Sequence, residues 1–91
     1  MAKEARFEAA KAYIESGKMH TFRAIFDIIP KYIMAEAMGM NYQTFQKKVG
    51  DLRRFTMGDI QDIGIILDTS PHTLFHLLDA EIPKRKTRKG S

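Results

Sequence analysis

Basic side chains gather in one short part of this 91-residue chain. Residues 41–54 contain a single acid, whereas residues 56–82 contain five acids and neither Lys nor Arg. The basic residues of the first segment are Lys47, Lys48, Arg53 and Arg54. Binding to a phosphate backbone needs such a local concentration of positive charge, whatever the net charge of the whole protein. Residues 41–54 are therefore the first candidate for contact with an anionic partner.

The C-terminal residues 83–91 form a second basic segment, with five of the fifteen basic residues of the chain. These five are Lys84, Arg85, Lys86, Arg88 and Lys89. Without them the chain has ten basic and eleven acidic residues, so the net charge of +4 says little about the rest of the protein. The segment has no apolar residues to bury, and we expect a flexible tail. Such a tail adds salt-dependent affinity for nucleic acid without sequence information, or serves only solubility.

Catalysis and metal binding have little support in the sequence. His72 and His76 are four residues apart, with Asp79 on roughly the same side of a predicted helix, a spacing that can hold a metal ion. No metalloprotease glutamate or cysteine pair accompanies them, so we interpret the histidines as a surface or half-buried pair. The chain has no cysteine, no set of nucleophile, base and orienting group, and no glycine-rich phosphate cradle. We predict a protein that is not an enzyme and holds no metal or cofactor.

Apolar residues at helical spacing predict an all-α fold of six helices, with no strand and no internal repeat. Four predicted helices cover residues 3–16, 22–29, 31–38 and 42–49. A fifth follows Thr56 and includes Leu67, and a sixth follows Ser70 and ends before Pro83. The predicted core consists of Phe45, Val49, Ile60, Ile63, Leu67, Leu74 and Phe75, with Ile33, Met34 and Ala37 on the inner face of the third helix. The predicted domains are an accessory helix (1–18), a main domain (19–82) and the tail (83–91).

Residues that favour helix ends mark several of these boundaries. Asn41, Thr56 and Ser70 each precede a predicted helix, where a side-chain oxygen accepts hydrogen bonds from the first backbone N–H groups. Asp59 stands three residues after Thr56, at the capping-box position. Pro30 ends the second helix and can open the third, because proline restricts the residue before it but fits a first helical turn.

A tight turn containing Gly39 joins the third and fourth predicted helices. Glycine permits a positive φ without a clash of Cβ, so the chain can reverse its direction there. Ala35, four residues earlier, is small enough to let the next helix approach closely. Two short helices with such a junction are typical of a helix-turn-helix, in which the second helix projects its N-terminal side chains into the major groove of DNA.

The sequence from Ala35 to Phe45, AEAMGMNYQTF, resembles the helix-turn-helix of the lambda-repressor-like (Cro/C1, XRE) DNA-binding domains. The apolar residues between Ile60 and Leu67 and the run from Thr69 to Phe75 fall where that family has its two closing helices. The resemblance covers roughly residues 20–80. It implies a compact five-helix helix-turn-helix domain, here with one additional N-terminal helix. It also implies a DNA-binding transcriptional regulator, repressor-like and of a kind found in prokaryotes and phages.

The resemblance identifies residues 42–49 as a recognition helix that reads double-stranded DNA. The implied base-contacting residues are Tyr42, Gln43, Thr44, Gln46 and Lys47. The implied phosphate-contacting residues are Lys31, Asn41, Lys48, Arg53 and Arg54. These side chains suit the roles, because an amide can pair bidentately with adenine and a lysine can donate to guanine O6 and N7.

Two features depart from the family pattern. Lys48 occupies a position where the family usually buries an apolar residue, and residues 49–52 (VGDL) replace its usual acidic residue followed by glycine. The fourth helix can therefore be rotated or shifted in register. This leaves open which of Gln46, Lys47 and Lys48 reads bases.

Two hypotheses for function follow. The first is a sequence-specific, repressor-like DNA-binding regulator that acts as a homodimer on a two-fold site. The second is a protein-interaction module that keeps the helical fold without DNA binding, suggested by the nearly neutral body and the acidic last two helices. Its partner would bind the N-terminal helix or an apolar patch near Met38 and Met40; RNA binding is a more distant third hypothesis.

With no targeting segment or membrane span in the sequence, we expect a cytoplasmic protein associated with the nucleoid.

Overall fold

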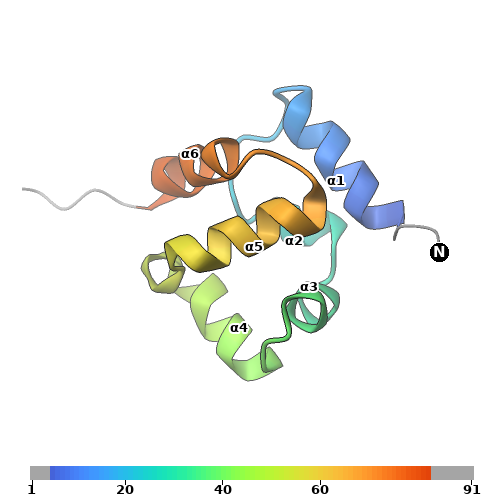
Figure 1. Cartoon of the computed structure of the whole chain (residues 1–91). Coiled ribbons are helices and arrows are strands. Elements are labelled where there is room, and N and C mark those ends of the chain that lie inside the picture. Colours follow the sequence, from blue (N-terminus) through green and yellow to red (C-terminus); the bar gives the residue numbers. More distant parts are fainter. Residues whose placement is uncertain (1–4, 83–91) are drawn as a thin grey trace, which may run out of the picture.

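The computed structural model describes residues 5–82, which form six α-helices and one short 3₁₀ helix and contain no strand (Figure 1). The elements are α1 (Ala5–Glu15), α2 (Ile25–Ile28), α3 (Lys31–Met38), α4 (Tyr42–Gly50), the 3₁₀ helix η1 (Leu52–Arg54), α5 (Met57–Leu67) and α6 (Pro71–Glu81). The all-α class is confirmed. The predicted tail and the predicted start of the first helix at Lys3 lie outside the described residues.

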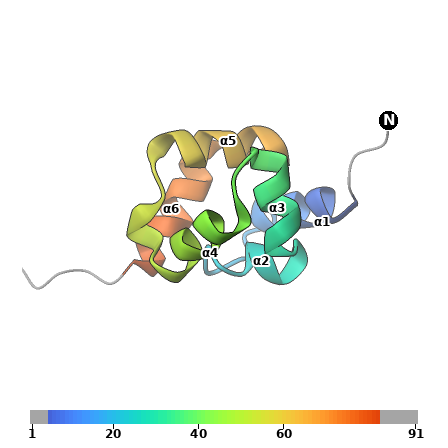
Figure 2. The same cartoon turned by 90° about the horizontal axis from the view of Figure 1, so that it is seen from below.

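Helix α5 runs through the middle of the molecule (Figure 1). It packs against α1, α3 and α6, and α4 packs against α3 and η1. α3 and α4 lie together on one side of α5, and the view from that side shows them next to each other at the near face (Figure 2). The face that carries α4 is therefore distinct from the side formed by α1 and α6.

Four phenylalanine rings join the elements around α4. Phe22 and Phe55 have ring centroids 5.2 Å apart, and Phe26 and Phe45 have centroids 5.3 Å apart. Contacts of 5.8 Å between Phe22 and Phe26 and of 6.0 Å between Phe45 and Phe55 close the ring of four, and all four pairs are edge-to-face. Edge-to-face pairs add roughly 0.5–1.5 kcal/mol each beyond the burial of their surface. This cluster fixes α4 to α2 and to the loop before α5.

Most of the predicted core is buried. Its buried members are Met34, Phe45, Val49, Ile60, Ile63, Leu67 and Leu74. The prediction for Phe75 is wrong: its side chain is 43% exposed. Leu74 and Leu78, one turn apart, face the core instead, and the next residue on a helix points about 100° away. Ala37 is also wrongly predicted, because it is exposed while Ala35 is buried on the same helix.

The second helix is much shorter than the predicted 22–29. Only Ile25–Ile28 is α-helical. The residues before it form turns closed by hydrogen bonds between residues three apart, such as the bond from Ile25 N–H to Phe22 O at 3.1 Å. The backbone N–H of Arg23 donates to Glu81 Oε1 at 3.0 Å, a contact with the far end of the chain. Tertiary contacts therefore shape this segment more than its apolar spacing does.

The predicted caps are confirmed. The Thr56 side chain accepts from the Asp59 N–H, and the Asp59 carboxylate accepts from the Thr56 N–H, each at 3.0 Å. Ser70 caps α6 with Pro71 in its first turn. Pro30 is the N-cap of α3, one position earlier than a first helical residue. Within residues 5–82, no helix combines the length and apolar character needed to cross a bilayer.

Candidate nucleic-acid interface

The junction between α3 and α4 is a tight turn at Gly39. This residue is left-handed (φ 70°, ψ 28°), and its N–H donates to Glu36 O while Met40 N–H donates to Ala35 O at 2.8 Å. These two bonds satisfy carbonyls that the end of α3 would otherwise leave without partners. A Cβ at Gly39 would meet nothing within 4 Å, so the requirement for glycine comes from the backbone conformation alone.

Asn41 begins α4 as predicted. Its Oδ1 accepts hydrogen bonds from Gln43 N–H at 2.8 Å and Thr44 N–H at 3.3 Å. The same side chain was also predicted to contact a phosphate, and its exposed position at the start of α4 leaves the amide NH₂ on the surface. The cap fixes the first turn of the helix, which carries three of the five predicted base-contacting residues.

The rotation of α4 is fixed by Phe45 and Val49, the two apolar residues that it buries. At about 100° per residue, Lys47 points about 180° away from their mean direction and Gln43 about 140° away. Tyr42, Gln43, Thr44, Gln46 and Lys47 are all exposed. The five residues predicted to contact bases therefore share the exposed surface of one helix, with Gln43 and Lys47 at its crest.

Surface hollows that contain basic side chains lie on both flanks of α4. On the side of α2 and α3, one hollow is lined by Arg23, Phe26, Asp27, Lys31, Gln46, Val49 and Gly50. On the other side, a second hollow is lined by Thr44, Lys47, Lys48 and Arg54. Lys31 on α3 and Gln46 on α4 therefore line the same hollow, although they are 15 residues apart in the sequence. Lys47 on α4 and Arg54 on η1 line the other hollow together. Lys31 and Lys47 have no ion-pair partner among residues 5–82.

Lys48 has an internal partner. Its Nζ donates to Asp59 Oδ2 at 2.6 Å and to Arg54 O at 3.2 Å, and the two charged side chains are only 16% and 12% exposed. Burial acts to raise the pKa of the Asp59 carboxyl, but the hydrogen bonds from Lys48 and Thr56 outweigh it and hold the pKa below its ordinary value of 3.8. The ammonium predicted to contact phosphate is therefore engaged in joining α4 to α5.

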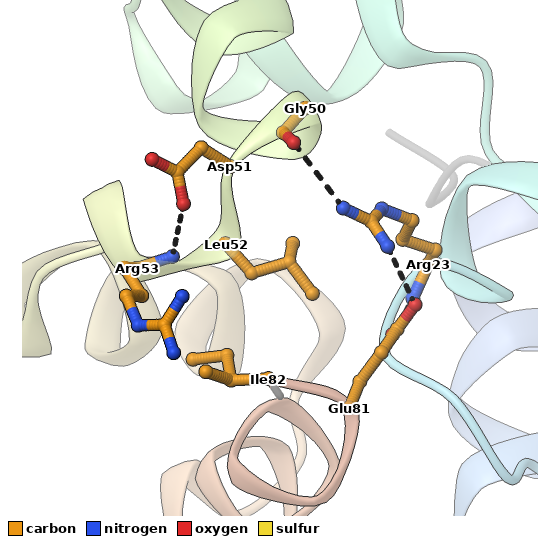
Figure 3. Close-up of a pocket in the computed structure, with 7 residues that line it drawn as sticks. All are labelled: Arg23, Gly50, Asp51, Leu52, Arg53, Glu81 and Ile82. Carbon is orange, nitrogen blue, oxygen red and sulfur yellow. Dashed lines mark hydrogen bonds and ion pairs between the residues drawn. The ribbon is translucent and has the colours of Figure 1, made fainter. Parts of the chain in front are cut away.

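The two arginines that follow α4 lie on the surface around Asp51. Arg54 Nε is 3.6 Å from Asp51 Oδ2, and the Arg53 backbone N–H donates to Asp51 Oδ1 at 3.3 Å. Only Arg54 lines the hollow beside Lys47. The Arg53 side chain faces a different hollow, past the C-terminal end of α4 (Figure 3).

Arg23, which no sequence pattern marked as part of the site, holds the C-terminal end of α4. Its Nε donates to Val49 O at 2.9 Å, and its two terminal nitrogens donate to Gly50 O at 3.4 Å and Glu81 Oε2 at 3.0 Å (Figure 3). A cation at the C-terminus of a helix satisfies free carbonyls and opposes the helix dipole. No local signal marks this role, because the partners of Arg23 lie 26 to 58 residues away along the chain.

His72 and His76, the pair whose spacing suggested a metal site, lie one turn apart on α6. His72 and His76 are exposed on α6 and line a shallow hollow with Met19 and Leu77. Among residues 5–82, no three His, Asp or Glu side chains are grouped in a way that could hold a metal ion.

Comparison of the chain with protein-family models, with curated proteins and with solved structures found no match in any of the three. Support for a function therefore comes from the geometry and charge of α3, α4 and the residues around them.

Proposed function

We propose that the protein binds double-stranded DNA with α4 in the major groove. The observation that carries this proposal is the exposed polar crest of α4 between two hollows that contain basic side chains. A major groove about 12 Å wide admits an α-helix, and phosphates of the two strands then lie on either side of it. Lys31 on one flank and Arg54 on the other suit these phosphates.

Within this arrangement Gln43 and Lys47 are the proposed base readers. Both lie on the side of α4 opposite its buried residues, and their functional groups match adenine and guanine edges respectively. Lys48 is left out of the set of DNA contacts, because its ammonium is bound to Asp59. The proposal therefore settles on Lys47 among the three candidates that the sequence left open.

The tight turn at Gly39 and the resemblance to lambda-repressor-like domains support a helix-turn-helix that works as a repressor-like regulator on the nucleoid. One recognition helix of nine residues reaches only a few base pairs. We therefore include a homodimer on a two-fold site in the proposal. Gel filtration with light scattering, with and without DNA, tests this part, and a mass that stays monomeric in both conditions would contradict it.

The test of DNA binding is an amide NMR titration with a mixed-sequence duplex at low and near-physiological salt. It is repeated with a chain that ends after Ile82. Expected shifts cluster on Lys31 and residues 41–54, survive removal of the tail and weaken with salt. Lys47→Ala should weaken binding, whereas Lys18→Ala, a matched change at an exposed lysine before α2, should not. Shifts confined to residues 84–89, or no shifts, would refute the proposal.

A protein-interaction module is the second candidate. Met57 and Ile65, both on α5, are 59% and 78% exposed, so they are the apolar side chains of that helix that a protein partner could cover. Met38 and Met40, where the sequence suggested an apolar patch, instead pack partly buried against the core. Binding that is insensitive to salt and that is lost in Ile65→Lys but kept in Lys47→Ala would favour this second candidate.

A further inference from the structure

Tyr42 and Gln46 form a hydrogen-bonded pair on the exposed surface of α4. Gln46 Nε2 donates to Tyr42 Oη at 3.0 Å. The two residues are four apart, so they lie one above the other on the same side of the helix. The Tyr42 side chain remains 42% exposed.

This hydrogen bond determines what the tyrosine can offer to a ligand. A phenol oxygen that accepts from an amide N–H keeps its own O–H free to donate. Acceptance of one hydrogen bond also polarises the hydroxyl and strengthens its donation to a further acceptor. The pair therefore presents one oriented hydrogen-bond donor, and its natural partner is an oxygen or nitrogen acceptor.

The position of the pair indicates which acceptor it meets. At about 100° per residue, Tyr42 lies about 40° and Gln46 about 80° from the mean direction of the buried Phe45 and Val49. Both are thus on the flank of α4, well away from the crest formed by Gln43 and Lys47. Gln46 lines a hollow that contains two cations, Arg23 and Lys31, and one carboxylate, that of Asp27. The cations outnumber the acid, and Lys31 has no ion-pair partner among residues 5–82, so a phosphate is the acceptor that suits this flank.

On these grounds we propose that Tyr42 and Gln46 act as one phosphate-docking unit, with Gln46 as a positioning residue for the Tyr42 hydroxyl. The proposal rests on DNA binding by α4 and replaces the base-reading roles that the sequence suggested for both residues. Tyr42 donates its O–H to a phosphate oxygen of the strand next to Lys31. The unit fixes the register of α4 on the duplex and carries no sequence information.

The test compares Tyr42→Phe and Gln46→Ala with wild-type full-length protein. The probe is a fluorescein-labelled duplex selected from a random pool on the wild-type protein, with single base-pair changes made across it. Tyr42→Phe should weaken binding to every duplex by the same factor, about tenfold for a lost hydrogen bond to a charged acceptor. Gln46→Ala should weaken it by about threefold, and the double variant should bind no more weakly than Tyr42→Phe, because the two residues act as one unit.

Two controls separate this role from a general loss of affinity. Tyr13→Phe removes a hydroxyl from another half-exposed tyrosine, on α1, and should leave binding unchanged. Tyr42→Phe should keep the wild-type slope of log affinity against log salt, because a neutral phenol releases no counterion, whereas Lys31→Ala, which removes a cation proposed to contact phosphate, should reduce that slope by about one unit.

The outcomes distinguish the inference from the proposed function. Binding of Tyr42→Phe at wild-type strength, a loss restricted to duplexes with one particular base pair, or additive losses in the double variant would overturn the docking unit while DNA binding stands. A wild-type protein that binds no duplex at either salt would overturn DNA binding and the docking unit with it.

Discussion

The ion pair between Lys48 and Asp59 offers the sharpest test of how α4 is held on the domain. We expect both Lys48→Met and Asp59→Asn to destabilise the protein, and the double variant to restore most of the loss. Each single change leaves one mostly buried charge without its partner, since the two side chains are 16% and 12% exposed. The shapes of both replacements are close to the originals, so lost packing contributes little.

The magnitude follows from the bonds that remain. Breaking a fully buried pair costs about 3–5 kcal/mol, whereas an exposed pair contributes about 0–1 kcal/mol. After Lys48→Met, Asp59 still accepts from the Thr56 N–H, and after Asp59→Asn, Lys48 still donates to Arg54 O. We therefore expect each single variant to lose about 1.5 kcal/mol, or about 6–12 °C in Tm for a domain of this size.

The double variant removes both charges, and replacing a buried pair with uncharged groups is often close to neutral. We expect it to lie within about 0.5 kcal/mol of wild type, which gives a coupling energy of about 3 kcal/mol. Urea denaturation followed by circular dichroism measures all four proteins. Additive losses in the double variant would show that Lys48 and Asp59 contribute independently and would refute the reasoning.

Acid adds a second readout of the same pair. The pKa of Asp59 is lower in the folded protein than its ordinary value of 3.8. The ionised Asp59 carboxylate therefore makes its full contribution to the stability of the fold when the pH is above 3.8, and this contribution is lost as the pH falls through the pKa of Asp59 in the folded protein. Wild type should lose stability on acidification below about pH 4, and Lys48→Met should lose less over the same interval, because a main cause of the depressed pKa is gone. An identical acid dependence in the two proteins would contradict this assignment.

Two further variants test the turn and the end of α4. Gly39→Ala should cost about 1–2 kcal/mol, the penalty of a left-handed backbone at a residue with Cβ, since no atom obstructs the new methyl group. Gly50→Ala is the matched control, because that glycine is helical with open space around it, and it should be neutral or slightly stabilising. Arg23→Gln should cost about 1 kcal/mol, mainly through the lost donors to Val49 O and Gly50 O, because the Arg23 side chain is 45% exposed and its pairing with Glu81 is weakened by solvent. Thermal denaturation measures all three, and a Gly50→Ala loss as large as that of Gly39→Ala would refute the account of the turn.

Apart from those of α2, the helix boundaries and caps could be predicted because their signals are local. Asn41 at the start of α4 and Thr56 with Asp59 at the start of α5 satisfy backbone N–H groups two or three residues away. Such signals lie within one turn of chain, where the identity of a few residues decides the geometry. The bounds of α3 match the predicted 31–38 for the same reason, since Pro30 and Gly39 flank that helix.

The contacts that join distant parts of the chain could not be predicted from these patterns. Arg23 and Glu81 are 58 residues apart, and Arg23 lies 26 residues before Val49, whose carbonyl it caps at the end of α4. Phe55 lies in a loop without periodic apolar neighbours, yet it completes the ring of four aromatic side chains. Phe75 follows Leu74 directly, so hydrophobicity alone could not show which of the two faces solvent.

The candidate site depends on both kinds of information. The sequence identified the polar residues of α4 but left its rotation open, because a lysine stands at position 48 where the resembling family has an apolar residue. Phe45 and Val49 fix that rotation by burial, and Asp59 makes a lysine acceptable on the inner flank by pairing with its ammonium. Lys48 and Gln46 then lie about 80° to either side of the buried direction, which leaves Gln43 and Lys47 at the crest. The next residue along that crest is Gly50, which has no side chain to contact a base. Under the proposed DNA binding, the crest from Gln43 to Lys47 covers little more than one helical turn. This short reach is the reason why the proposal includes a second copy of the chain on a two-fold site.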